Sequence, residues 1–354
     1  MAPRSKTSTS RADAATERPA RPQMSDIARL AGVSVSAVSR ALRGSPEIGE
    51  ETRKRIVELA RSLNYTVNVG AQNLRLRQNT TIAVVVPSFS NLRQRLTEPF
   101  FISLISAIAN ALTDRGFEML LIRVEATRTN YADAYWTGRA AGLIFTGQWL
   151  DHDQLNELAL GKVPFVVWGE QREQQIYCTV GTDNCQGGRL ATEHLLDKGA
   201  RRVAIVGDFG TPELKQRYEG YLLAHRERGL EPDPDLVVNT RFDNETIARD
   251  TEKLLARTPD VDGIFACSDL TAMTVINTLI REGRRVPEDI LVAGYDDIEL
   301  AGYFRPSLTT VRQPMERAAD AIVDALVEQL KGERPKSNRL VTELVTREST
   351  ATSK

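Results

Sequence analysis

The 354-residue sequence has few of the residues that build disulfide frameworks and metal sites. It contains three cysteines, Cys178, Cys185 and Cys267, and three histidines. The cysteines are odd in number and lack Cys-x-x-Cys spacing, so neither a disulfide framework nor a zinc site is predicted. The histidines are isolated along the chain. We therefore expect no metal, no cofactor, and a reducing compartment such as the cytoplasm.

Long apolar runs and enzyme motifs are absent as well. No stretch approaches the roughly 18 consecutive apolar residues that suggest a membrane-spanning helix. There is no Gly-x-x-x-x-Gly-Lys-[Ser/Thr] phosphate loop, no Gly-x-Ser-x-Gly elbow and no His-Glu-x-x-His motif. Asp296 and Asp297 offer two carboxylates, but adjacent residues at a strand end point in opposite directions. We expect no catalytic residues and no contact with a membrane.

What remains is a composition typical of a globular protein with more than one domain. Hydrophobic residues make up 41% of the chain and charged residues 26%. The first 22 residues differ, because they are mainly Ala, Ser, Thr, Arg and Pro with almost no large apolar side chain. Such a segment cannot bury enough surface to fold, so we predict a disordered leader over 1–22.

Charge is distributed unevenly along the chain. Residues 1–80 hold 14 Lys plus Arg and 7 Asp plus Glu, whereas the remaining residues hold 32 and 40. The formal net charge of −1 therefore conceals a basic N-terminal part and an acidic body. A basic segment of this kind is the electrostatic footprint of phosphate binding.

Two short helices with a tight corner between them follow the leader. Ile27, Leu30 and Ala31 have the spacing of one apolar helical face. Gly32 stands where a left-handed residue ends a helix, and Ser34 is a good N-cap for the next one. A third helix after residue 49 is expected to bury Ile56, Leu59, Ala60 and Leu63. The pattern predicts a helix-turn-helix, and the basic charge argues against a helical bundle that binds no nucleic acid.

The second helix is the candidate DNA-reading element, because such helices enter the major groove by their N-terminal residues. It buries Val38, Ala41 and Leu42. Arg40 suits a bidentate contact with guanine, and small apolar side chains suit thymine methyl groups. The candidate DNA-binding residues on this helix are Ser34, Val35, Ser36, Ala37, Ser39 and Arg40.

From residue 80 onward the pattern alternates strand and helix. We predict strands at 81–86, 118–122, 142–145, 163–168, 202–207, 263–266 and 290–295. We predict helices at 101–115, 186–198, 214–228 and 270–282. Repeated strand–helix units form open parallel sheets with helices on both faces. The number of strands exceeds one ordinary sheet, so we expect two sub-domains with a break near Gly181, and ligands at the carboxyl ends of the strands.

Residues 25–76 resemble the DNA-binding head of the LacI family of sugar-responsive transcriptional repressors. The matching stretches are Asp26-Ile27-Ala28, Ala31-Gly32-Val33-Ser34, Val38-Ser39-Arg40, Glu51-Thr52-Arg53, Leu63-Asn64-Tyr65, and Asn68 with Ala71 and Leu74. The similarity continues to about Val345. It implies an N-terminal all-α helix-turn-helix head plus an α/β body, with two doubly wound parallel-sheet sub-domains as in periplasmic sugar-binding proteins.

The resemblance also implies a division of the chain. We expect the helix-turn-helix domain at 23–66, a hinge helix and linker at 67–79, and an effector-binding and dimerisation domain at 80–354. The sub-domains of the last are expected at about 80–180 with 314–335, and at 181–313 with 336–347. The chain should cross between them three times, the third time near 311–314.

In the resembling family the hinge helix binds the minor groove and inserts a leucine between base pairs. The corresponding residues here are Asn68, Ala71 and Leu74. This chain departs from the family at Val67, where proline is common, and at Gly70, which lowers helix propensity by roughly 1 kcal/mol.

The effector pocket is expected where strand ends meet between the sub-domains. The resemblance implies that Phe100, Phe101, Thr146, Arg217, Phe242, Ser268, Asp296 and Gln313 line it, and Gln148 and Trp168 stand at strand ends too. A guanidinium and a carboxylate can each bind vicinal hydroxyls, and aromatic rings cover the apolar face of a sugar. These residue types favour a neutral mono- or disaccharide. Two departures from the family are Ser268, where asparagine is usual, and about seven extra residues at 92–98.

The sequence thus predicts a homodimeric repressor of carbohydrate-utilisation genes that binds a palindromic operator and is released by a sugar. It is expected in the bacterial cytoplasm, associated with the nucleoid when bound. The polar tail 347–354 has no leucine heptads, so no tetramer is predicted. The alternatives are a purine or nucleoside co-repressor protein, a carbon-catabolite regulator of the same fold, and a periplasmic sugar-binding protein.

Overall fold

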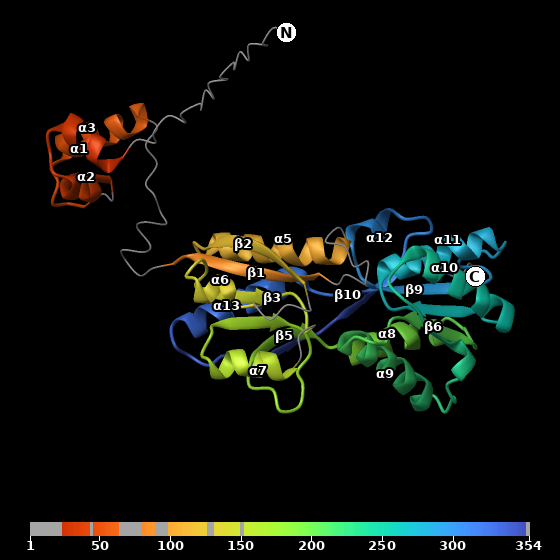
Figure 1. The fold of residues 1–354 in the computed structure, drawn as a ribbon. Helices are drawn as coiled ribbons and strands as arrows, with labels where there is room; N and C mark the ends of the chain where they lie inside the picture. The colour runs from red at the N-terminus through yellow and green to blue at the C-terminus, as the bar shows by residue number, and fades with distance from the viewer. Residues whose placement is uncertain are drawn as a thin grey trace, which may run out of the picture. The chain divides into compact units, whose positions relative to one another are not determined.

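The computed structural model describes residues 23–42, 45–63, 79–88, 98–125, 131–148 and 152–351 (Figure 1). The chain divides into two compact units, residues 1–78 and residues 79–354. None of the helices in the described ranges is long and apolar enough to cross a membrane. We call the first unit the head and the second the body.

The head contains three helices, α1 (Met24–Ala31), α2 (Val35–Leu42) and α3 (Glu50–Ser62). Gly32 ends α1 in the left-handed region at φ +64°, and the Ser34 hydroxyl accepts a hydrogen bond from the Ala37 amide at 3.2 Å. The predicted corner and N-cap are therefore confirmed. The buried core of the head consists of Ile27, Ala28, Ala31, Val38, Ala41, Ile56 and Ala60.

The predicted buried face of α1 is wrong at one residue. Leu30 is 56% exposed, and Ala28 is buried in its place. Each residue of an α-helix advances the side chain by about 100°, so Ile27, Ala28 and Ala31 share one stripe and Leu30 lies on its flank.

The body is built on two six-stranded sheets (Figure 1). The first has the order β11-β5-β4-β3-β1-β2, and all of its pairs are parallel. Its strands are β1 (Thr81–Ser88), β2 (Glu118–Glu125), β3 (Gly142–Phe145), β4 (Phe165–Trp168), β5 (Cys178–Thr182) and β11 (Asn338–Leu340). Residues 82–86 are all buried, as the continuous apolar run predicts.

The second sheet has the order β12-β10-β9-β8-β6-β7. Only β12 is antiparallel to its neighbour, β10. The strands are β6 (Val203–Gly207), β7 (Val237–Asn239), β8 (Gly263–Ala266), β9 (Leu291–Asp296), β10 (Thr309–Arg312) and β12 (Glu343–Val345). The predicted architecture of two doubly wound parallel sheets is confirmed.

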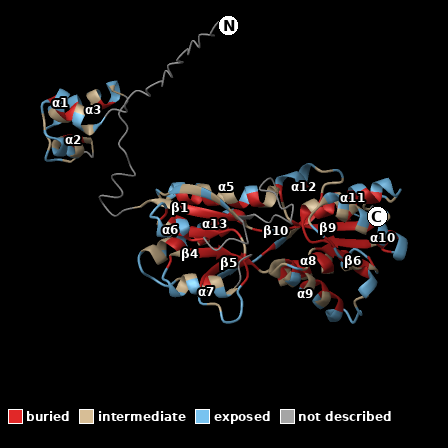
Figure 2. Cartoon of the chain, in the orientation of Figure 1, coloured by how far each residue is buried: buried red, intermediate tan, exposed pale blue. Residues whose placement is uncertain are grey.

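Helices cover both faces of each sheet, so the central strands are buried, whereas edge strands such as β2 and the outer faces of the helices are partly exposed (Figure 2). The first sheet packs against α5 (Pro99–Asp114) and α13 (Met315–Leu330) on one face, and against α6 (Asp133–Trp136) and α7 (His152–Leu160) on the other. The second sheet packs against α8 (Asn184–Asp197) and α9 (Pro212–Glu227) on one face. Its other face holds α10 (Asn244–Arg257), α11 (Asp269–Arg281) and α12 (Glu299–Tyr303).

The chain crosses between the sheets three times, after β5, after β10 and after β11. The crossing near 311–314 is therefore the second, and the third lies at 341–342. The predicted boundary that assigns all of 336–347 to the second sub-domain is wrong, because residues 338–340 pair with β5 of the first sheet. A three-residue strand carries too little pattern to reveal its partner from sequence.

Candidate functional site

The body encloses a cavity of about 770 Å³ at the carboxyl ends of strands from both sheets. All ten residues that the sequence predicts for an effector site line it. They are Phe100, Phe101, Thr146, Gln148, Trp168, Arg217, Phe242, Ser268, Asp296 and Gln313. The first five belong to the part of the chain that carries the first sheet, and Arg217, Phe242, Ser268 and Asp296 to the part that carries the second. A ligand in this cavity would touch both sub-domains.

Aromatic rings form one wall of the cavity. The Phe100 and Trp168 ring centroids are 6.3 Å apart, and Phe100 meets Phe101 edge to face at 5.4 Å. Trp168 ends β4 and Phe100 lies in the first turn of α5, where Pro99 occupies the first helical position. Rings held in this way present apolar faces to a ligand with little conformational freedom to lose.

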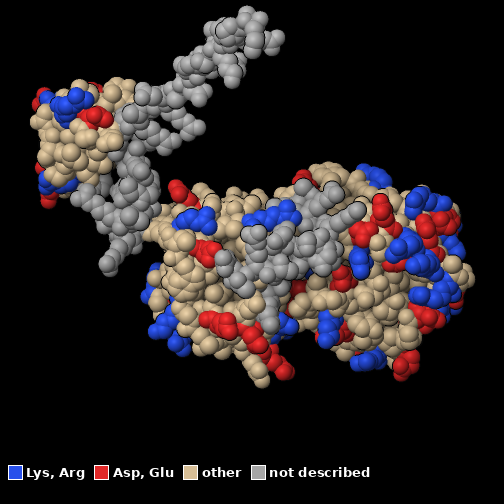
Figure 3. Space-filling view, viewed as in Figure 1, with Lys and Arg blue, Asp and Glu red and all other residues tan. Residues whose placement is uncertain are grey.

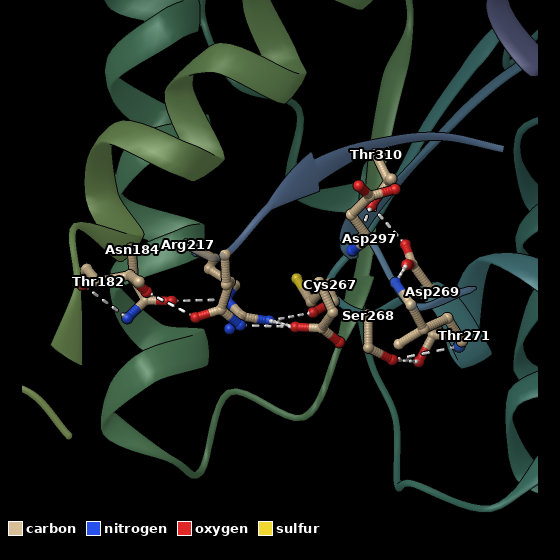
Figure 4. Close-up of polar contacts among 12 residues, drawn as sticks. Thr182, Asn184, Arg217, Cys267, Ser268, Asp269, Thr271, Asp297 and Thr310 are labelled. Carbon is tan, nitrogen blue, oxygen red and sulfur yellow. Dashed lines mark hydrogen bonds and ion pairs between the residues drawn. The ribbon is translucent and has the colours of Figure 1, made fainter. Parts of the chain in front are cut away.

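Arg217 of α9 is buried and its guanidinium is fixed by neighbours on several sides (Figure 4). Its Nε donates to Asn184 Oδ1 at 2.8 Å, and its Nη1 donates to the Cys267 carbonyl oxygen at 2.5 Å. The guanidinium carbon lies 3.5 Å from the centre of the Tyr295 ring. Because these contacts set both position and plane, the remaining N–H groups are oriented before any ligand binds.

Asp296 ends β9 and faces the cavity near Arg217. Its Oδ1 lies 3.7 Å from Arg217 Nη1 and accepts a hydrogen bond from Gln313 Nε2 at 2.8 Å. Gln313 is fixed in turn by the Thr182 hydroxyl, which donates to Gln313 Oε1 at 2.7 Å. Burial raises the pKa of the Asp296 carboxyl to about 6, against the opposing effects of Arg217 and Gln313. This carboxylate is therefore mostly an acceptor at neutral pH and is half protonated near pH 6.

Asp297 points elsewhere, as expected for adjacent residues at a strand end. Its carboxylate pairs with Arg312 Nε and Arg347 Nη2, each at 2.6 Å. The two arginines belong to the strand β10 and to the segment after β12. Asp297 thus links the end of β9 to β10 and to the segment after β12. Asp296 and Asp297 therefore do not form an acid–base couple.

Ser268 lines the cavity, but its hydroxyl is already engaged. It accepts from the Thr271 amide at 3.2 Å as the N-cap of α11 and lies 2.8 Å from the Thr271 hydroxyl. The next residue, Asp269, is fully buried and bonds to the Ile298 amide at 2.8 Å and the Thr310 hydroxyl at 2.5 Å (Figure 4). Burial, with Asp296 nearby, raises the pKa of Asp269. Asp269 stabilises the fold around the site.

Sequence reasoning missed several polar residues that line the cavity. Asn184 orients Arg217, and Thr182 orients Gln313. Thr182 ends β5 and Asn184 lies two residues after it, but no strand was predicted there from the sequence. Recognising a strand at 178–182 would have placed both at a strand end. The cavity is also lined by Glu98, Asp208, Glu213, Arg241, Asp243 and Glu245.

None of the predicted DNA-binding residues of α2 and its N-cap is fully buried. Ser34, Val35, Ser36 and Arg40 are exposed, whereas Ala37 and Ser39 are half-buried. Val35 is 47% exposed although it is apolar. The predicted hinge residues Asn68, Ala71 and Leu74 lie outside the described residues, as do 92–97.

Both units of the chain match family profiles. Residues 23–68 match the profile described as bacterial regulatory proteins of the lacI family, and residues 192–350 match a periplasmic binding protein-like domain. The first match covers the helix-turn-helix, and the second covers all six strands of the second sheet.

Relatives match over nearly the full length. The HTH-type transcriptional regulator CelR of Thermobifida fusca is 34% identical over 345 residues, which cover 94% of this chain and 99% of CelR. The HTH-type transcriptional repressor PurR of Aliivibrio salmonicida is 29% identical over 333 residues, which cover 92% of this chain and 97% of PurR.

Solved structures of other proteins match the fold of this chain over nearly its full length. A CelR–cellobiose complex has a TM-score of 0.67 and 33% identity, and the match covers 93% of this chain and all of that one. The Lac repressor dimer bound to operator and the anti-inducer ONPF has a TM-score of 0.83 at 24% identity, over 94% of this chain and 99% of that one, which shows the fold alone. From its helix-turn-helix head, its two parallel sheets and these full-length matches, the chain belongs to the LacI family of bacterial regulatory proteins and is a DNA-binding transcriptional regulator.

Proposed function

We propose that this regulator represses carbohydrate-utilisation genes and that a neutral mono- or disaccharide in the body cavity releases it from a palindromic operator. The observation that carries the proposal is the pre-oriented pair Arg217 and Asp296 in the same cavity as the wall formed by Phe100 and Trp168. A donor fork, an acceptor and an aromatic platform are the groups that bind a polyhydroxyl ring. A cavity of about 770 Å³ is large enough for a disaccharide.

The charge of the cavity lining supports an uncharged ligand. Six carboxylate side chains line it, and the only cations among the lining residues of the described chain are Arg217 and Arg241. The carboxylates are Glu98, Asp208, Glu213, Asp243, Glu245 and Asp296. A sugar phosphate or a uronate would meet net repulsion from this lining. The related CelR was solved with cellobiose, a neutral disaccharide.

The regulator is released from its operator if the sugar binds best to an arrangement of the sub-domains that binds the operator weakly. The candidate ligand contacts are divided between the sub-domains, with Trp168 on one side and Arg217 on the other. A ligand that bridges them therefore favours a closed arrangement. Closure changes the relative orientation of the two sub-domains at the segments that cross between the sheets. A bound sugar would act on the rest of the chain through this change.

A homodimer is proposed because two heads read two halves of a palindrome. The body exposes large apolar side chains that suit a second copy. Leu300 and Tyr303, one helical turn apart on α12, are 52% and 72% exposed, and Ile280 of α11 is 53% exposed. Apolar side chains grouped on the outer helices of a sheet are typical of an isologous interface. The proposed setting is the cytoplasm, with the nucleoid as the site of action.

A thermal-shift screen tests the ligand class directly. A sugar at 100 times its dissociation constant should stabilise the protein by about 2.7 kcal/mol. Cellobiose, maltose, glucose, ribose, galacturonate and hypoxanthine are compared on the full chain. Trp168→Ala should abolish the shift, whereas Trp136→Ala, which removes a 61% exposed tryptophan that does not line the cavity, should not. A shift with hypoxanthine alone, together with tighter operator binding, would identify a purine co-repressor protein instead.

A further inference from the structure

The recognition helix α2 contains a single charged residue, Arg40, and the structure fixes its guanidinium at two points. Nη1 lies 2.9 Å from Glu47 Oε2, and Nε donates to the Ser36 carbonyl oxygen at 3.4 Å. The first contact comes from the segment before α3, and the second from α2 itself. The pair is therefore held between two elements of the helix-turn-helix.

The backbone brings Glu47 to this position. The Ser45 amide donates to the Arg40 carbonyl oxygen at 3.1 Å, and the Glu47 amide donates to the Ser45 hydroxyl at 3.4 Å. The first bond ties the loop to the C-terminal half of α2, and the second holds Glu47 against Ser45 within the loop. The guanidinium and the carboxylate meet because the loop is anchored to the residue whose side chain it contacts.

Neither stability nor general attraction to DNA explains a carboxylate here. The Arg40 and Glu47 side chains are 45% and 66% exposed, and ion pairs this exposed contribute little to stability. An acidic side chain beside the base-reading helix repels phosphate, so it lowers affinity for any duplex. The contact of Glu47 with Arg40 is the feature that remains to explain a carboxylate at this position.

We propose that Glu47 is a specificity-determining residue that orients Arg40 for its guanine contact. The inference rests on the proposed base contact of Arg40. Of the five N–H donors of the guanidinium, one is directed at Ser36 and one at Glu47, which leaves three, one on Nη1 and two on Nη2, so that each terminal nitrogen still offers a donor. Two such parallel donors match the O6 and N7 acceptors of guanine. Fixing the side chain in advance lowers the cost of ordering it when DNA binds.

The test compares Glu47→Ala with Glu50→Ala in the full chain. Glu50 is also exposed, lies three residues further along the same unit and pairs with Lys54 at 3.4 Å, so each variant removes one negative charge from the head. Preferred sites are selected from a random duplex library for each protein. Affinities are then measured for the wild-type selected site, for that site with each guanine replaced in turn, and for a scrambled duplex.

Both variants should bind the scrambled duplex more tightly by a similar factor, because both lose one repelling charge. Glu47→Ala should in addition lose about threefold to tenfold discrimination at one guanine of each half-site, whereas Glu50→Ala should keep it. Glu47→Gln, which keeps an acceptor without the charge, should retain more discrimination than Glu47→Ala. Equal discrimination in all of these proteins overturns the inference.

Arg40→Ala separates failure of the inference from failure of the base contact. If Arg40→Ala relaxes one guanine position and Glu47→Ala does not, Arg40 reads that base and Glu47 does not orient it. If Arg40→Ala relaxes no position, the base contact and the inference are both wrong. Loss at the same position in both variants, with Glu50→Ala unchanged, is the result expected.

Discussion

Arg217 is the central residue of the proposed effector site, because the protein fixes it on several sides before a ligand arrives. A guanidinium presents a rigid planar fork of donors, whereas a lysine ammonium neither stacks on Tyr295 nor reaches Asn184 and Cys267 together. The surrounding contacts therefore preserve the planar geometry of the Arg217 guanidinium more than its positive charge.

Arg217→Lys should therefore weaken sugar binding by about tenfold to a hundredfold, the loss of one or two hydrogen bonds to a charged group. Isothermal titration calorimetry with the sugar identified in the screen measures it. Arg226→Lys is the matched control, because Arg226 lies on the same helix, α9, and is exposed. Unchanged affinity in Arg217→Lys would remove Arg217 from the site.

The Asp296 carboxylate gives the site a pH dependence. Its pKa is raised from 3.8 to about 6, so the folded protein binds this proton more tightly than the unfolded chain. Its contribution to folding stability is consequently largest below pH 3.8 and is lost as the pH rises through about 6. Sugar hydroxyls donate to the ionised form, so ligand affinity should follow the opposite trend.

We expect sugar affinity to fall as the pH decreases from 7 to 5, with the midpoint near the raised pKa of about 6. Titration calorimetry in a series of buffers measures the trend. An affinity that stays flat or increases over that range would mean that the ionised Asp296 does not accept from the ligand.

At the scale of elements, the sequence predicts what periodicity and burial determine. The strands at 142–145 and 263–266 match the structure residue for residue, because each is a short buried apolar run between turns. The three-residue strands β7, β11 and β12 were not predictable, since their pairing depends on the sheet edge they meet. Asn184 and Thr182 were missed for another reason, because no strand was predicted at 178–182, whereas residues after predicted strands, such as Asp296, were found.

The corner of the helix-turn-helix depends on the left-handed conformation of Gly32. A Cβ there meets no atom within 4 Å, so only the backbone conformation at φ +64° disfavours other residues. Gly32→Ala should cost the head roughly 1–2 kcal/mol, and Gly32→Asn less, because asparagine tolerates this region. Thermal unfolding of the head, followed by circular dichroism, measures both. Equal stability of the two variants would show that the corner relaxes.

At the scale of the whole molecule, net charge differs between segments of the chain. Acidic and basic side chains are mixed over the visible face of the body (Figure 3). In the sequence, residues 1–22 hold five basic and two acidic residues, and residues 23–63 hold seven and five. The leader therefore contributes more net positive charge than the helix-turn-helix itself.

Removing residues 1–22 should weaken binding to a scrambled duplex and reduce the salt dependence of that affinity, while discrimination between sites is kept. Filter binding at several salt concentrations measures both quantities. If the salt dependence is unchanged, the leader does not contact phosphate.

The dimer proposal makes its own prediction. Leu300→Asp should place a charge in the apolar face of α12 and shift the protein toward monomer, whereas Leu160→Asp, at an even more exposed leucine of α7, should not. Sedimentation velocity distinguishes the two. A Leu300→Asp protein that stays dimeric would place the interface elsewhere.

The most direct test of the account is the operator affinity of the full chain, measured with and without a saturating sugar that binds the body cavity. We expect the sugar to lower that affinity by about fivefold to a hundredfold, and Trp168→Ala to abolish the response while operator binding remains. An operator affinity that is unchanged or increased by every sugar that binds the cavity would contradict the proposal that a sugar releases this regulator from DNA.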